Sequence, residues 1–155
     1  MEFETVAVAT RITARISLVL FAFAFVAETI KFGRNHYSLV WGSFVLAHIV
    51  HMICVVAYFI VLGEPPELTP ALGTLVAGLV ALGWIATDLI RKRIASASRM
   101  MPTVCSWYLW FLFCMAHVSR LLDPERGSWI NVPLLIVAFG SGVVRIVLLR
   151  RAPQP

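Results

Sequence analysis

The stretch SLVWGSFVLAHIVHMICVVAYFIVL, from Ser38 to Leu62, contains no Asp, Glu, Lys or Arg. A helix needs about 20 mainly apolar residues to cross the hydrocarbon layer of a bilayer, and this stretch exceeds that length. It therefore predicts a transmembrane helix. It also carries two histidines, His48 and His51, well inside its apolar run.

Four further apolar segments are also about 20 residues long, as a membrane crossing requires. They are Ile12–Ile30, Leu68–Ile90, Thr103–Leu122 and Trp129–Leu149. Polar or helix-breaking residues separate them, as in Gly63-Glu-Pro-Pro66, where consecutive prolines cannot continue a helix. Hydrophobic residues make up 60% of the 155 positions and charged residues only 14%, whereas a soluble domain is about one quarter charged. We expect one all-α domain, residues 1–155, built as a polytopic membrane bundle of about five helices.

The charges outside these segments indicate an orientation. The basic residues cluster in the first and third loops and at the C-terminus, whereas the acidic ones lie in the N-terminus and the other two loops. The basic set is Lys31, Arg34, Arg91, Lys92, Arg93, Arg99, Arg150 and Arg151; the acidic set is Glu2, Glu4, Glu64, Glu67, Asp123 and Glu125. The positive-inside rule then predicts the N-terminus outside and the C-terminus inside. The net charge of +5 is explained by this pattern, and we expect no nucleic-acid partner.

The histidines are the main candidates for function, because ionisable residues inside a span are costly and usually functional. His48 and His51 are one helical turn apart, and His117 lies in the fourth span. Spans two and four run in the same direction, so His51 and His117 fall at one depth, roughly 20 Å from the inner edge at 1.5 Å per residue. Two neutral imidazoles on neighbouring helices suit the axial ligation of a haem iron.

We therefore expect His51 and His117 to be haem ligands, with His48 as the alternate from span two. Arg120, one turn beyond His117, and Arg15, near the outer end of span one, are candidate cations for the haem propionates. Other interpretations stay open: histidines that only form hydrogen bonds between helices, or a proton relay through all three. Zinc or non-haem iron fits less well, because no carboxylate lies at the same depth.

The remaining polar and aromatic residues of the spans have ordinary explanations. Pairing with the basic loops, or reaching toward the inner surface, accounts for Glu28, Asp88 and Arg145. Tryptophans near span ends are typical of the membrane interface; these are Trp41, Trp107 and Trp129. Cys54, Cys105 and Cys114 all fall in apolar segments without CxxC spacing, so they indicate neither a disulfide framework nor a zinc site.

Several short motifs resemble those of the small bacterial ferric reductase-like transmembrane proteins. They are Thr13-Ala-Arg15-Ile-Ser-Leu18, Ala47-His-Ile-Val-His51, Thr87-Asp88, Trp107-Tyr-Leu-Trp110 and Arg120, in that order. The resemblance implies a haem b protein of the bacterial inner (cytoplasmic) membrane that transfers electrons. It implies a quinol or a separate reductase as the donor, since this chain has no soluble domain for a nucleotide or flavin.

The chain departs from that family at the start of span four. Met101 and Pro102 stand where the family carries a Leu-His pair, so one ligand histidine is missing and His36 would lack its partner. The resemblance then implies at most the outer haem. Two functions of other classes remain: a non-redox accessory subunit of a larger membrane complex, and a membrane enzyme acting on a lipid or isoprenoid. In the enzyme, His48, His51 or His117 would act as acid or base.

Overall fold

The computed structural model describes residues 3–30, 36–63, 70–91, 100–122, 129 and 131–151. These residues form five α-helices. The helices are α1 (Phe3–Ala27), α3 (Tyr37–Leu62), α4 (Pro70–Arg91), α5 (Met100–Leu122) and α6 (Asn131–Arg151). The expectation of an all-α chain is confirmed. Among the described residues, four helices are long and apolar enough to cross a membrane: α1, α3, α5 from Thr103 onward, and α6. In α4 the apolar part is the shorter stretch Gly78–Ile90.

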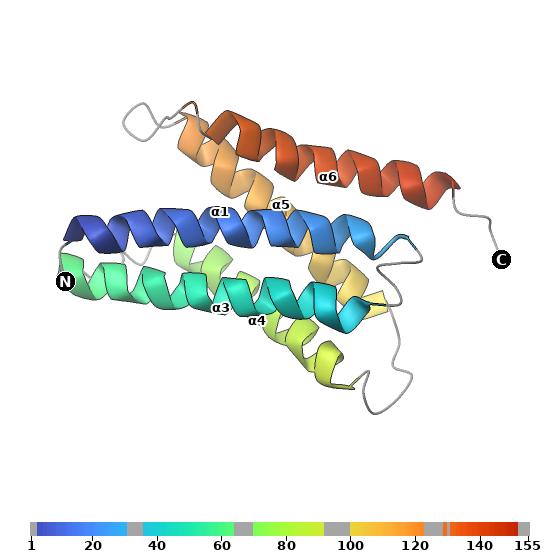
Figure 1. Cartoon of the computed structure of the whole chain (residues 1–155), viewed down its shortest axis with the longest axis horizontal. Helices are drawn as coiled ribbons and strands as arrows, with labels where there is room; N and C mark the ends of the chain where they lie inside the picture. Colours follow the sequence, from blue (N-terminus) through green and yellow to red (C-terminus); the bar gives the residue numbers. More distant parts are fainter. Residues whose placement is uncertain are drawn as a thin grey trace.

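Helix α1 lies between α3 and α6 (Figure 1). It packs along α3 on one side and along α6 on the other, while α5 crosses obliquely behind it and carries α4 on its far side. The first helix begins at one end of the bundle and α6 finishes at the opposite end. Helix α1 thus contacts α3, α5 and α6, whereas α4 packs on α5 and α3.

The helix ends agree with the predicted spans at one element and differ at another. Helix α3 begins one residue before the predicted span and stops at Gly63, which has a φ of 73° and donates its backbone N–H to the Phe59 carbonyl at 3.1 Å. Glycine adopts this left-handed conformation without the Cβ penalty of other residues. Helix α1, in contrast, begins at Phe3, nine residues before the predicted start at Ile12. The added turns pack on α3, where the Phe3 and Tyr58 rings lie 5.3 Å apart.

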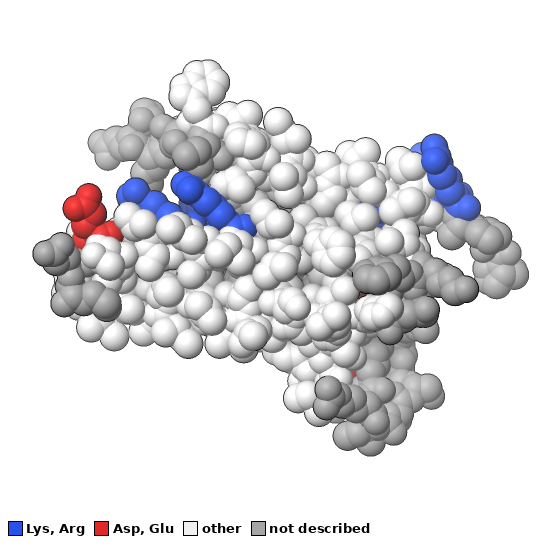
Figure 2. Space-filling view, in the orientation of Figure 1, with Lys and Arg blue, Asp and Glu red and all other residues white. Residues whose placement is uncertain are grey.

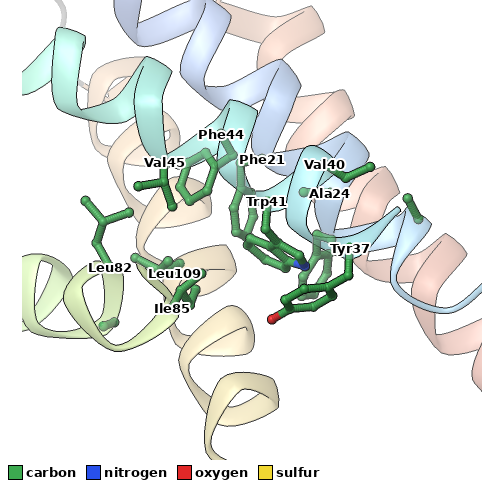
Figure 3. Packing of buried hydrophobic residues seen from close by; sticks show 13 residues of the cluster. Phe21, Ala24, Tyr37, Val40, Trp41, Phe44, Val45, Leu82, Ile85 and Leu109 are labelled. Carbon is green, nitrogen blue, oxygen red and sulfur yellow. The ribbon is translucent and has the colours of Figure 1, made fainter. Parts of the chain in front are cut away.

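The core is a cluster of aromatic side chains between α1, α3 and α5. Phe21 contacts Trp41 and Phe44 from α3 and Phe113 from α5, with ring centroids 6.1, 5.2 and 4.8 Å away. Figure 3 shows Phe21, Trp41 and Phe44 together with Leu82 and Ile85 of α4 and Leu109 of α5. Trp41 is only 1% exposed. The interface role expected for Trp41 is therefore wrong, because its indole is buried among other aromatic rings.

Helices α5 and α6 approach closely at a glycine. The indole Nε1 of Trp110 donates a hydrogen bond to the Ala138 carbonyl at 2.8 Å. A Cβ placed on Gly142 would lie 2.6 Å from Cζ2 of Trp110. The absence of a side chain at Gly142 therefore makes room for the indole, and this contact fixes the position of α6.

Candidate functional site

Polar side chains of α1 contact α3 along one face, and both α3 histidines take part. Ser17 Oγ lies 2.8 Å from Nδ1 of His48, and Thr13 Oγ1 lies 3.2 Å from Nδ1 of His51. One turn further along α1, the Thr10 hydroxyl donates to the Cys54 carbonyl at 3.2 Å. Residues three or four apart share one helix face, so this row orients the two imidazoles toward α1.

The surroundings of Thr13 determine which nitrogen of His51 carries the proton. Its hydroxyl lies 2.9 Å from the Ala9 carbonyl and 3.1 Å from the Thr10 carbonyl. A hydroxyl has one proton to donate, and carbonyl oxygens only accept. When Thr13 donates to its own helix, its oxygen accepts the Nδ1–H of His51. The other ring nitrogen, Nε2, then carries a lone pair.

His117 on α5 reaches the same tautomer by another route. Its Nδ1 lies 2.9 Å from the Phe113 carbonyl oxygen, four residues earlier in the helix. Since that oxygen accepts, Nδ1 is the donor and Nε2 carries the lone pair. The side chain is only 5% exposed. His48 differs from both, because no second acceptor within the described residues fixes the direction of its bond to Ser17.

The three histidines lie at similar heights along α1. His48 and His51 are opposite Ser17 and Thr13. Leu18 and Cys114 belong to one buried cluster. Because α5 runs antiparallel to α1 (Figure 1), His117, one turn past Cys114, lies near the height of residue 15. That height is two residues from Thr13, or about 3 Å of helix rise.

The backbones of α3 and α5 stay apart at this height. Among the described residues, no Cα atom of α3 comes within 8 Å of a Cα atom of α5. Aromatic rings bridge the two helices instead: Phe113 lies 6.3 Å from Phe44 and 5.9 Å from the His48 ring, centroid to centroid. The His48 and His51 rings are 5.8 Å apart. The imidazoles thus lie beside an apolar, aromatic-lined region between α3 and α5.

The two arginines expected near the histidines have different positions. Arg120 is exposed and close enough to both His51 and His117 for electrostatic interaction. Arg15 is half-buried and lies two residues from both Thr13 and Ser17, which is about 200° around the helix. It therefore does not share the face of α1 that contacts the α3 histidines.

The other predicted positions do not join this group. His36 is exposed at the N-cap of α3 and has interactions of its own. Met101 and Pro102 lie in the first turn of α5, where proline is tolerated because the N–H groups have no helical partner. Among the described residues, no three His, Cys, Asp or Glu side chains come together closely enough to hold a metal ion.

A second polar group, which the sequence did not indicate as a unit, lies near the other end of the bundle. Arg145 on α6 is only 3% exposed. Its Nη1 donates to the Phe25 carbonyl at 2.7 Å and forms an ion pair with Glu28 at 3.1 Å. Its guanidinium carbon lies 4.1 Å from the centroid of the Phe25 ring. Arginine thus caps the C-terminal end of α1, where a cation is favoured by the helix dipole.

Two further polar residues lie close to this ion pair. The Tyr37 hydroxyl donates to Asp88 at 3.1 Å, and Asp88 is only 5% exposed. Glu28 and Arg145 pair with each other inside the bundle, which the sequence interpretation did not foresee, and for Asp88 the pairing with the basic loops stays a prediction because those loops lie outside the described residues. Within the described residues, Nε1 of Trp41 and Nε of Arg145 are buried without hydrogen-bond partners. We refer to Glu28, Tyr37, Asp88 and Arg145 as the inner polar cluster.

Comparison with known proteins identifies no relative of this chain. No protein-family model matches the chain, and neither a curated protein nor a solved structure shows significant similarity to it.

Proposed function

We propose that this chain is a haem b-binding membrane protein of the ferric reductase-like type that takes part in electron transfer. His51 and His117 are the proposed axial ligands, and His48 is the alternate. The observation that carries the proposal is the shared placement of Nδ1 in His51 and His117. In each residue Nδ1 lies within hydrogen-bond distance of a protein oxygen, and a proton on Nδ1 leaves the lone pair of Nε2 available.

This arrangement is the one expected of a histidine that ligates a metal. Such a residue usually donates its other ring N–H to a nearby oxygen, which fixes the ring and raises the basicity of the ligating nitrogen. Thr13 and the Phe113 carbonyl have that role here. Two ligands from two helices suit a haem better than a zinc ion, which takes at least three protein ligands.

The surroundings also fit an apolar macrocycle with charged side groups. Phe44 and Phe113 lie between α3 and α5 and make this region apolar. Arg120, close to both ligand histidines, is the cation for a propionate. Arg15 as a second propionate cation remains a prediction that no contact tests. When bound between two imidazoles, haem supplies one-electron chemistry rather than an open position for oxygen.

The membrane setting of the proposal comes from the sequence. The basic loops favour five crossings of a bacterial inner membrane, with the N-terminus outside and the C-terminus inside. His51 and His117 then lie in the outer half of the bilayer. A quinol or a separate reductase is the proposed electron donor, since electrons must enter from outside this chain.

The same hydrogen bonds also favour a second function, in which the chain is an accessory subunit of a larger membrane complex. Ser17–His48 and Thr13–His51 join α1 to α3, and polar contacts of this kind hold transmembrane helices together without any cofactor. In this case the free Nε2 atoms have no ligand to bind, and the purified protein is colourless.

Optical spectroscopy separates these functions. We expect protein purified in mild detergent from haem-replete cells to show the reduced spectrum of haem b. His51→Ala and His117→Ala should each abolish it, while His36→Ala, a change to an exposed histidine, should leave it intact. A folded, colourless wild-type preparation would overturn the proposal. Loss of the spectrum in His48→Ala but not in His51→Ala would move the ligand to the alternate position.

A further inference from the structure

A pair of arginines on α1 faces away from the histidines. Arg11 and Arg15 are four residues apart, so both lie on one face of the helix. Arg11 is exposed and Arg15 is half-buried. Figure 2 shows basic side chains over the N-terminal half of α1, and a largely uncharged surface from there to the basic C-terminal end of α6.

The packing of the bundle places this pair at the membrane boundary. On this side of α1 the buried cluster consists of Leu18, Cys114 and Ala138. Helix α5 ends eight residues after Cys114, and α6 begins seven residues before Ala138. Arg11 lies seven residues before Leu18, at the height where α5 ends and α6 begins. Figure 1 shows α1 and α3 continuing past that point.

The length of α5 supports the same boundary. Its apolar part, Thr103–Leu122, has 20 residues, which is about the thickness of the hydrocarbon layer. The outer end of α5, at Leu122, therefore lies near the height of Arg11, whereas the apolar stretch of α3 continues to Leu62. Arg15 lies one turn deeper and reaches the same height by extending its side chain outward.

No protein group neutralises these arginines in the described part of the chain. There, neither Arg11 nor Arg15 forms a hydrogen bond or an ion pair with another side chain. Glu4, on the same face of α1, is seven residues from Arg11 and does not pair with it there. Arginine side chains near helix ends extend to the membrane interface, and a guanidinium matches the geometry of a phosphate. Phospholipid headgroups are the anions available at that height.

We propose that Arg11 and Arg15 together bind the headgroup phosphate of an anionic phospholipid at this end of the bundle. This inference does not depend on the haem. It requires only that the helices cross a membrane. It gives Arg15 a role distinct from propionate binding, and the two roles predict different results for the same variant.

Photo-crosslinking tests the site directly. The protein is placed in phosphatidylcholine nanodiscs containing phosphatidylglycerol with a photoreactive headgroup, and the adducts are located by peptide mass spectrometry. We expect an adduct near residues 8–18 that falls about tenfold in Arg11→Gln/Arg15→Gln, since charge-assisted hydrogen bonds are lost. The adduct near Arg150 and Arg151, at the opposite end of α6, should not change and is the internal control.

Further outcomes decide between anions. An unchanged α1 adduct in the double variant would overturn the proposal, and so would its full displacement by inorganic phosphate. If the double variant does not fold, Arg11→Gln and Arg15→Gln alone should each lower the adduct by about threefold. An Arg15→Gln protein that keeps its α1 adduct but shifts its haem spectrum would assign Arg15 to a propionate instead.

Discussion

The inner polar cluster and the outer histidines place polar groups inside the bundle near its two ends, and they differ in how the protein satisfies them. In the inner polar cluster the charged groups meet one another, through Arg145–Glu28 and Tyr37–Asp88. Each outer imidazole has one nitrogen bonded to a protein oxygen and one left over. The inner polar cluster therefore pairs its groups within the protein, although Nε of Arg145 has no hydrogen-bond partner there, whereas each outer imidazole bonds through the nitrogen that orients its ring.

This difference separates residues that hold helices from residues that are available to a ligand. Arg145 joins the end of α1 to α6, because it contacts both the Phe25 carbonyl and Glu28. His51 and His117 also bond to protein, but only through the nitrogen that orients the ring. Four substitutions test this comparison by stability, from the largest expected loss to the smallest.

Arg145→Met should have the largest effect. It removes the capping bond to Phe25 and leaves the Glu28 carboxylate without its cation in a buried site. Breaking one side of a buried ion pair costs about 3–5 kcal/mol. We expect a fall in the free energy of unfolding of that size, measured by denaturant titration in detergent. Helices α1 and α6 should separate before α1 and α3.

A matched double variant shows whether the loss comes from the unpaired carboxylate. Glu28→Gln combined with Arg145→Met removes both charges, so it should recover at least half of the loss. If the double variant is as unstable as Arg145→Met alone, the ion pair with Glu28 is not the cause. The contact with the Phe25 carbonyl would then account for the effect.

Tyr37→Phe should have the second largest effect. It deletes the hydroxyl that donates to buried Asp88 at 3.1 Å and keeps the ring that packs against Trp41. A hydrogen bond to a charged group contributes about 1.5–3 kcal/mol, so the free energy of unfolding should fall by that amount. Tyr58→Phe, on the same helix near its other end, is the control. Equal losses in both variants would show that the hydrogen bond from Tyr37 to Asp88 does not stabilise the protein.

Gly142→Ala should follow, through packing rather than charge. The added methyl group would lie against the Trp110 ring, and overpacking of this kind costs about 1–3 kcal/mol. The better helix propensity of alanine returns about 1 kcal/mol. Gly140→Ala, where a Cβ has no neighbour within 4 Å, should be neutral or stabilising. A wild-type melting temperature for Gly142→Ala would show that α6 shifts without cost, and that the inner polar cluster tolerates the shift.

The sequence predicted the helices well because length and hydropathy dominate the choice of structure in a membrane. Ser38–Leu62 matched α3 to within one residue, and Gly63 was recognised as a break. The early start of α1 at Phe3 was missed because hydropathy locates the apolar span but does not show where the helix itself begins. The similar height of His51 and His117 followed from helix rise alone, and their packing in the bundle agrees with it.

Side-chain partners could not be predicted in the same way. Arg145 and Glu28 are separated by 117 positions in the chain, and nothing in the local pattern of either residue indicates the other. The burial of Trp41 was missed because an indole near a span end is equally compatible with lipid or with a core. The tautomers of His51 and His117 depend on oxygens of α1 and of the preceding α5 turn, so they required coordinates.

Thr13→Val should have the smallest effect on stability and is the sharpest test of the comparison. It keeps the shape of the side chain and removes the oxygen that accepts Nδ1–H of His51. Polar contacts between transmembrane helices average about 0.6 kcal/mol, so unfolding should barely change. Loss of a group that orients a metal ligand lowers affinity about 10–100-fold, so haem should be lost in a titration with apo-myoglobin as the acceptor. Ser17→Ala removes the matching contact to His48 and should retain haem. If both variants keep haem equally, the hydrogen bonds of the outer histidines serve only to hold α1 against α3, as Arg145 holds α1 against α6.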